Sequence, residues 1–187
     1  MMRVNKRFNS ASFDNYNCTT VSQKELVDLL KKFCKNGFDK NIIIIGGVGT
    51  GKTHLAYAIM NSITGRWMHS GNEYYQMGPV YYGTAKEMID NIKCSWNDKS
   101  ISNMDIYCQI PVLIIDELGV QYGTDCERTE MYEIFNNRYN DMLPIIALSN
   151  NSLPELKKIL GQRIYDRLTS GAIIYELSGK SHRQVEA

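Results

Sequence analysis

The sequence predicts an α/β domain of three layers, in which helices cover both faces of a mostly parallel, five-stranded sheet. Short apolar runs alternate with amphipathic segments along the chain, which is the order typical of parallel sheets. A glycine-rich motif stands between one apolar run and a helical segment, and an acidic pair directly follows another run. Both placements are typical of domains that bind phosphate groups.

Length and composition indicate one globular domain. The chain has 187 residues, with 43% hydrophobic residues and a net charge of +1, so no global field favours a nucleic-acid partner. The five cysteines have no metal-ligand spacing with the three histidines, which favours reduced thiols. No apolar stretch is long enough for a membrane span or a signal peptide, so we expect a cytoplasmic protein without a membrane partner.

The first half of the chain predicts an arm, two helices and a strand before a long excursion. Residues 1–20 are polar and predict an extended arm, and residues 21–187 the folded domain. Ser22 and Glu25 form a capping-box pattern that begins the first helix, and Gly37 ends it. A strand over residues 42–45, a helix after the glycine-rich motif and an excursion over residues 65–79 follow.

Four strands are predicted in the remainder of the chain. They cover residues 80–82, 112–115, 145–148 and 172–177, and the continuously apolar second one is typical of a strand covered on both faces. Helices are predicted over residues 86–92 and over 125–142, where apolar residues recur at a spacing of three and four. A further helix begins with a capping box from Ser152 to Glu155 and ends at Gly161.

The glycine-rich motif fits the phosphate-loop pattern G-x-x-x-x-G-K-[ST]. Glycines allow successive backbone N–H groups to point at phosphate oxygens, and the following helix adds its positive N-terminus. Lys52 is expected to reach the β- and γ-phosphates of a nucleoside triphosphate, and the Thr53 hydroxyl to bind Mg²⁺. The predicted loop residues are Gly46, Gly47, Val48, Gly49, Thr50, Gly51, Lys52 and Thr53.

Polar residues after two other strands supply candidates for hydrolysis. Asp116 is expected to hold Mg²⁺, and Glu117 to act as the general base toward a water molecule. An ordinary acidic turn is the alternative, but the phosphate loop favours the catalytic interpretation. Asn150 is expected to orient the attacking water, and its alternative role is to form the turn before the next helix.

Three arginines are further candidates. Arg163 and Arg167 lie four residues apart and share one face of a predicted helix, where they are either simply solvated or reach the γ-phosphate of a neighbouring subunit. Arg183 is either a phosphate-sensing cation or a residue of the tail.

Together these motifs resemble the initiator and helicase-loader branch of the AAA+ ATPases. They are most similar to bacterial and phage helicase loaders of the DnaC type. The resemblance covers nearly the whole chain and includes the phosphate loop with His54 and Leu55 after it. Its other segments are residues 7–16, 136–139, 143–153 and 161–168.

The resemblance implies a P-loop NTPase of the AAA+ class without a helical lid domain. It implies that ATP and Mg²⁺ are the ligands and that His54 belongs to the nucleotide site. It further assigns Asn150 as sensor 1, Arg167 as the arginine finger with Arg163 beside it, and Arg183 as the late sensor arginine. Hydrolysis is then slow and dependent on an oligomer or on DNA, because the active sites are shared between subunits.

The same resemblance implies a partner and a process. It predicts self-association on single-stranded DNA and loading or remodelling of a replicative DNA helicase during replication initiation. Two departures are the absence of the usual N-terminal helicase-binding domain before residue 21 and the length of the 65–79 excursion. A transposition helper ATPase of the same fold, a small nucleoside or nucleotide kinase, and a module that merely binds ATP remain alternatives.

Direct support for DNA binding comes from one basic and aromatic strip, of the kind that binds single strands. Solvated lysines and core aromatic side chains explain the same pattern equally well. The strip comprises Tyr81, Tyr82, Lys86, Lys93, Trp96 and Lys99.

Overall fold

The computed structural model describes residues 6–64, 68–70, 73–75, 80–95, 103–120 and 124–178. In this part of the chain, the main sheet has the strand order β4-β5-β6-β1-β7, and every pairing in it is parallel. The predicted parallel, five-stranded sheet is therefore confirmed. Its strands are β1 (Ile42–Gly46), β4 (Val80–Thr84), β5 (Val112–Asp116), β6 (Ile145–Ser149) and β7 (Ile173–Leu177).

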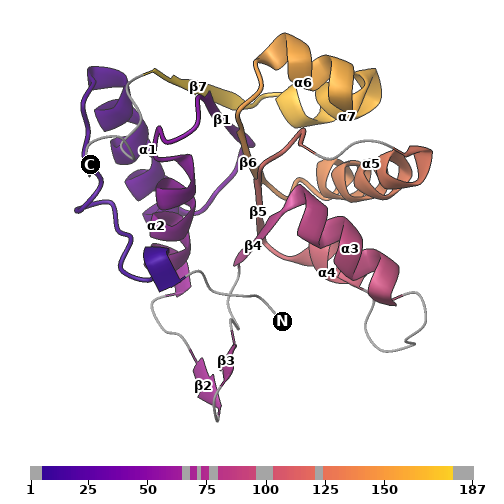
Figure 1. Cartoon of the computed structure of the whole chain (residues 1–187), viewed down its shortest axis with the longest axis horizontal. Coiled ribbons are helices and arrows are strands. Elements are labelled where there is room, and N and C mark those ends of the chain that lie inside the picture. The colour runs from indigo at the N-terminus through magenta and orange to yellow at the C-terminus, as the bar shows by residue number, and fades with distance from the viewer. Residues whose placement is uncertain are drawn as a thin grey trace.

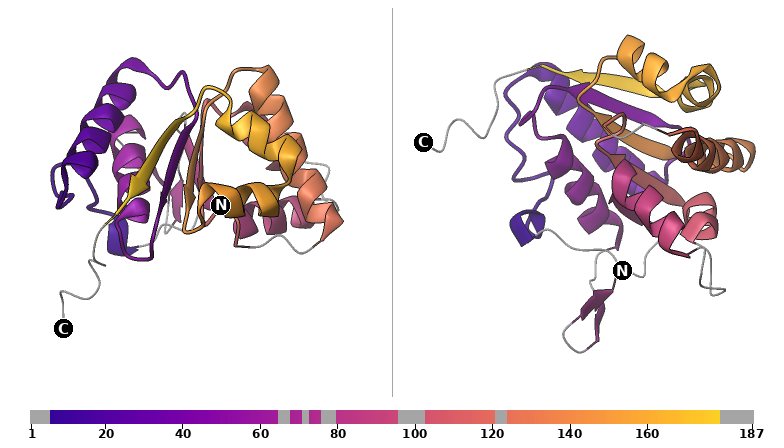
Figure 2. Two further views of the ribbon diagram at one scale, coloured as in Figure 1. Left: turned by 90° about the horizontal axis from the view of Figure 1, so that it is seen from above. Right: turned by 45° about the vertical axis from the view of Figure 1, so that its right-hand side comes forward.

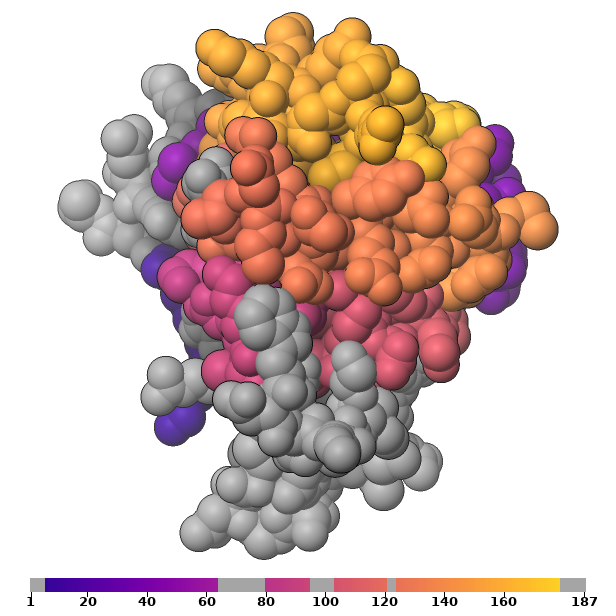
Figure 3. All heavy atoms as spheres, turned by 90° about the vertical axis from the view of Figure 1, so that its right-hand side faces the viewer, coloured from indigo at the N-terminus to yellow at the C-terminus, as the bar shows by residue number. Residues whose placement is uncertain are grey.

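Helices cover both faces of this sheet, which confirms the three layers (Figures 1 and 2). On one face lie α1 (Val21–Asn36) and α2 (Lys52–Thr64). On the other lie α3 (Ala85–Ser95), α4 (Asn103–Gln109), α5 (Asp125–Asn140), α6 (Leu153–Leu160) and α7 (Gln162–Thr169). In the space-filling view of that second face, α5 lies between α6 and α7 above and α3 and α4 below (Figure 3).

The two faces of the sheet have separate apolar cores, because alternate side chains of each strand point to opposite faces. Ile42 and Ile44 of β1 pack toward α1 and α2, whereas Ile43 and Ile45 pack toward the other helices. Among the described residues, none of the helices has the length and apolar composition that crossing a membrane requires.

The first helix begins earlier than predicted. Its N-cap is Thr20, whose hydroxyl accepts a hydrogen bond from Gln23 N at 3.2 Å, so the predicted box from Ser22 to Glu25 is wrong. Gln23 explains the shift, because its buried Oε1 also accepts from the backbone N–H groups of Thr19 and Thr20. The box from Ser152 to Glu155 is confirmed at the start of α6.

The described part of the arm lies against the domain instead of extending from it. A 3₁₀ turn, η1 (Lys6–Phe8), is followed by three buried apolar side chains, Ala11, Phe13 and Tyr16, in the core beneath α1 and α2. Within the excursion, β2 (Met68–Ser70) and β3 (Glu73–Tyr75) form a two-stranded antiparallel sheet. The short helix α4 was not predicted.

Candidate nucleotide-binding site

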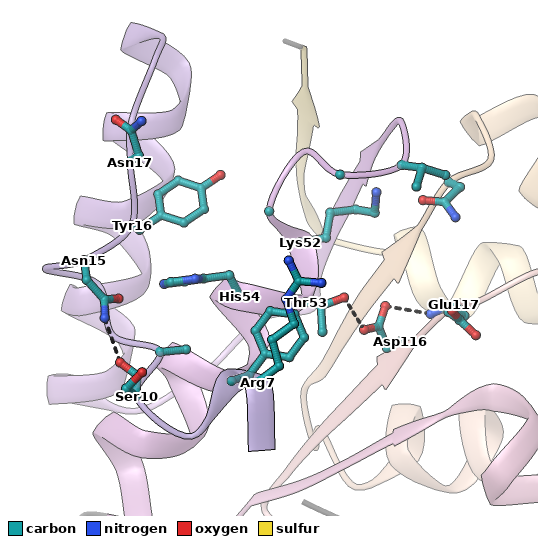
Figure 4. A pocket seen from close by; sticks show the side chains of 16 residues that line it. Arg7, Ser10, Asn15, Tyr16, Asn17, Lys52, Thr53, His54, Asp116 and Glu117 are labelled. Atoms are coloured by element: carbon teal, nitrogen blue, oxygen red, sulfur yellow. Dashed lines mark hydrogen bonds between the residues drawn. The ribbon is translucent and has the colours of Figure 1, made fainter. Parts of the chain in front are cut away.

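A pocket of about 490 Å³ opens at the carboxyl ends of the parallel strands, where the loops after β1, β5 and β6 meet (Figure 4). Its volume lies within the range of about 300–1,000 Å³ that is usual for small-molecule sites. The predicted site residues that line it are Val48, Gly49, Gly51, Lys52, Thr53, His54, Asp116, Glu117 and Asn150. The structure thus brings residues from three separate loops into one cavity.

The phosphate loop curls around the Lys52 ammonium. Lys52 Nζ donates hydrogen bonds to the carbonyls of Gly46 and Gly47, each at 2.7 Å. Gly51 has a φ of +93°, and a Cβ there would lie 2.6 Å from the ring of Tyr16, so both its conformation and its surroundings require glycine. Because the ammonium already donates to carbonyl oxygens of the loop, the same position suits phosphate oxygens.

Two oxygen-bearing side chains meet beside the loop. The Thr53 hydroxyl donates to Asp116 Oδ2 at 2.9 Å, and Asp116 is only 5% exposed. Mg²⁺ prefers hard oxygen ligands and often takes only one or two from the protein, the others coming from phosphates and water. The donor set of Thr53 and Asp116 therefore fits the predicted magnesium ion.

A second hydroxyl, which was not assigned to the site from the sequence, reaches the same carboxylate. Tyr82 OH donates to Asp116 Oδ2 at 2.9 Å. Burial, and then the negative charge of Asp116, raises the pKa of Tyr82, so this phenol remains a hydrogen-bond donor. Asp116 Oδ1 in turn accepts from the backbone N–H of Glu117 at 2.8 Å, so both carboxylate oxygens are held.

Glu117 and Asn150 line the pocket from two neighbouring loops. The two loops are joined, because Leu118 N donates to Leu148 O at 2.9 Å and Ser149 Oγ donates to Leu118 O at 2.6 Å. The turn that carries the acidic residue is thus fixed relative to the one that carries the amide. This arrangement suits a base and an orienting group acting on one water molecule.

Arg163 and Arg167 lie on α7 and do not line the pocket. Arg163 is exposed, whereas the Arg167 guanidinium lies over the ring of Tyr132 at 4.9 Å. Its Nε donates to Asn136 Oδ1 at 3.0 Å, and its Nη2 to Tyr132 OH at 3.2 Å. Arg167 is therefore held at the surface of its own subunit. Arg183 lies outside the described residues.

The structure describes four residues of the predicted DNA strip. Its two tyrosines pack toward the core, which contradicts their predicted role, and its two lysines form ion pairs within the domain. Tyr82 is buried and bonded to Asp116, and half-buried Tyr81 packs its ring against that of Tyr107 at 4.9 Å between centroids, so both tyrosines face the core. Lys86 forms an ion pair with Asp90 at 2.7 Å, and Lys93 one with Glu127 at 3.0 Å. Trp96 and Lys99 lie outside the described residues.

Residues of the N-terminal arm form one wall of the pocket. No polar or apolar pattern predicted this role, although the family resemblance included residues 7–16. Figure 4 shows Arg7, Tyr16 and His54 on that side of the cavity. Tyr16 OH donates to Thr50 O at 3.1 Å, and His54 Nε2 lies 3.0 Å from Ser12 O. Burial raises the pKa of Tyr16 to about 12. The arm is thus attached directly to the phosphate loop and to the helix after it.

A family model described as IstB-like ATP binding protein matches residues 1–187. Among curated proteins, the replicative helicase loader DnaC of Escherichia coli K12 is 28% identical over 168 residues, which are 87% of this chain and 64% of the relative. The DnaC of Buchnera aphidicola subsp. Baizongia pistaciae is 29% identical over 178 residues, covering 90% of this chain and 67% of the relative. The chain thus spans only 64% of the length of the E. coli relative.

Solved structures agree with these sequence matches. The crystal structure of the DnaC helicase loader has a TM-score of 0.78 and 25% identity, with 93% of this chain and 100% of that chain covered. Replication initiator DnaA bound to AMPPCP and single-stranded DNA has a TM-score of 0.73 at 23% identity, with 94% and 51% covered. The second likeness shows that the fold is shared.

Proposed function

Because the chain belongs to the family of IstB-like ATP-binding proteins, we propose that it is an ATP-hydrolysing AAA+ switch that loads or remodels a replicative DNA helicase. The observation that carries this proposal is the contact between Thr53 and Asp116 at the pocket that Lys52 and Glu117 also line. That contact joins the phosphate loop to the acidic strand end, as metal-assisted hydrolysis of a nucleotide requires. The likeness to DnaC helicase loaders supports the helicase as partner.

Five of the residues that line the pocket have distinct roles in this function. Lys52 and the N–H groups of the loop bind the β- and γ-phosphates, and Thr53 and Asp116 hold Mg²⁺, which when bound neutralises phosphate charge. Glu117 accepts a proton from the attacking water, and Asn150 orients that water. The Glu117 N–H bond to Asp116 keeps the base next to the metal ligand.

Full activity requires a second subunit. Arg167 does not line the pocket of its own subunit, so as an arginine finger it acts on the γ-phosphate bound by a neighbour, with Arg163 beside it and Arg183 as the sensor. Isolated subunits therefore hydrolyse ATP slowly. Assembly on single-stranded DNA brings Arg167 to the neighbouring pocket and accelerates turnover.

A combined sizing and turnover experiment tests this function. Light scattering and phosphate release are measured with ATP, ADP and a slowly hydrolysed analogue, each with and without single-stranded DNA. Lys52→Ala is expected to lose ATP binding, and Arg167→Ala to keep ATP binding but lose turnover. Arg128→Ala is the control, because Arg128 is an exposed arginine of α5 outside the pocket. A monomer whose turnover is unchanged by Arg167→Ala contradicts the shared active site.

Partner capture separates this function from its alternatives. The ATP-bound protein is expected to retain a replicative helicase, and the ADP-bound protein to release it. Retention of a transposase instead assigns the chain to the transposition helpers of the same fold. Transfer of phosphate to a nucleoside or nucleotide in a substrate screen contradicts the proposal and supports a kinase.

A further inference from the structure

We propose that Tyr82 is a positioning residue for the magnesium site, acting through Asp116. This inference rests on the proposed function, because it concerns how that function holds its metal ion. Tyr82 OH donates to Asp116 Oδ2 at 2.9 Å, and the side chain is only 9% exposed. A largely buried phenol that donates to a largely buried carboxylate makes a strong contact, because little water competes for either group.

The backbone sets this contact through strand register. In the parallel pair of β4 and β5, Tyr82 lies opposite Ile114 and Thr84 opposite Asp116. Tyr82 therefore stands two residues before the carboxyl end of the sheet, and its long side chain reaches the residue at that end. A shorter hydroxyl side chain at the same position lacks the length of the phenol ring.

The ring of Tyr82 is also seated against the helix that carries the other metal-binding oxygen. Its centroid lies 4.8 Å from that of Tyr57, which belongs to α2, and Thr53 lies one turn earlier in the same helix. Tyr82 thus contacts both elements that supply the oxygens. This position lets one side chain fix Asp116 relative to the helix of Thr53.

The two hydroxyls on Asp116 Oδ2 have different roles once a cation is present. Thr53 would supply its hydroxyl oxygen to the cation, and its hydrogen bond to Asp116 would compete with that role. Tyr82 has no such second task, so its bond continues to orient the carboxylate. Hydrogen bonds to a metal-binding carboxylate are typically worth a factor of 10–100 in metal affinity.

Tyr81 provides a matched control in the adjacent position. It lies on the opposite face of β4, where its hydroxyl contacts Tyr107 OH at 3.2 Å. Tyr81→Phe and Tyr82→Phe each remove one hydroxyl from the same strand, but only the second hydroxyl contacts Asp116. If each hydroxyl contributes only to stability, both variants have an altered melting temperature, and neither has an altered requirement for Mg²⁺.

The experiment measures the dissociation constant of ATP over a series of free Mg²⁺ concentrations, starting from an excess of chelator, for the full chain and both variants. Tyr82→Phe is expected to raise the Mg²⁺ concentration for half-maximal effect about 10-fold and to leave the affinity for metal-free ATP unchanged. Tyr81→Phe is expected to match the parent chain in both quantities.

The outcomes separate this inference from the proposed function. If Tyr82→Phe has the same Mg²⁺ requirement as Tyr81→Phe while the parent chain binds ATP with Mg²⁺, the positioning role is overturned and the ATP-dependent function stands. If ATP binding by the parent chain does not respond to Mg²⁺ at all, the metal site itself is wrong. Thermal melts of all three proteins establish that both variants are folded.

Discussion

Glu117 has an unusual backbone conformation. Its φ is +54°, in the left-handed region. For a residue other than glycine, this backbone conformation costs about 1–3 kcal/mol of conformational free energy. The turn is held by the bond from its own N–H to Asp116 Oδ1 and by the bond from Val120 N to Glu117 O. Strain of this kind is concentrated at functional sites, which agrees with the proposed role of Glu117 as a base.

Glu117→Gln is therefore expected to bind ATP normally and to hydrolyse it at least about 100-fold more slowly, since an amide cannot accept the proton. Phosphate release and ATP affinity are measured together, with Glu25→Gln, an exposed change on α1, as the control. Unchanged turnover in Glu117→Gln would show that ATP is only a structural ligand.

The hydrogen bonds of Arg167 require a guanidinium. Its three nitrogens donate to Asn136 Oδ1, Tyr132 OH and Arg163 O, whereas a lysine ammonium has a single nitrogen. Under assembling conditions, Arg167→Lys is thus expected to lose turnover about 1,000-fold, as an arginine finger does when removed. Arg128→Lys is the control. Activity retained in Arg167→Lys would mean that positive charge alone suffices.

At the scale of elements, the sequence predicted the features that depend on contiguous residues or on a regular spacing of apolar residues. The five strands, the phosphate loop and the Asp116–Glu117 pair were found because each is local. The helix α4 was missed because its seven residues bury only Tyr107 and Cys108, too few to show a period. The contact of Tyr82 with Asp116 depends on the register between β4 and β5, which no local pattern encodes.

Arg138 of α5 connects the end of α4 with the segments before β5 and β6 through hydrogen bonds. The sequence predicted two of these elements but not their connection. Arg138 is fully buried and donates to four backbone carbonyls, at the end of α4 and just before β5 and β6. Burial lowers the pKa of Arg138 to about 10. The guanidinium thus supplies donors to carbonyl groups at the ends of three elements. The four acceptors are the carbonyls of Tyr107, Ile110, Pro111 and Pro144.

Arg138→Met is expected to lower the free energy of unfolding by about 3 kcal/mol, because it removes four charge-assisted hydrogen bonds to buried carbonyls. Because the pKa of Arg138 is lowered, the folded state loses this proton at a lower pH than the unfolded chain does. The contribution of this group to the free energy of unfolding therefore changes only as pH rises through about 10. Urea unfolding between about pH 6 and pH 9 should accordingly give a constant difference between the two proteins. A difference that varies in this window contradicts the assignment to Arg138.

At the scale of the whole molecule, the arm and the domain line one pocket. Hydrogen bonds of Asn61, His54 and Tyr16 attach the described part of the arm to α2 and the phosphate loop. Asn61 Nδ2 donates to Ala11 O at 2.8 Å, so the segment before Ser12 is fixed as well. Since Arg7 lines the same pocket as the phosphate loop, a nucleotide bound there is expected to contact both parts at once.

MgATP is therefore expected to protect the arm from trypsin. Lys6 and Arg7 are exposed in a 3₁₀ turn that buries none of its residues, so cleavage after them needs only local opening. A ligand at about 100 times its dissociation constant stabilises the closed state by about 2.7 kcal/mol, which slows cleavage about 100-fold. The rate is followed by mass spectrometry of the released peptides.

The controls for this experiment distinguish closure of the arm from general stabilisation. Cleavage after Lys158, on α6 and away from the pocket, should slow less than cleavage after Arg7, because only the arm must move to release the nucleotide. Lys52→Ala should show no protection at either position, since it does not bind ATP. Equal slowing at both positions in the parent chain would mean that the arm is a fixed wall of the pocket, so that the nucleotide enters without displacing it.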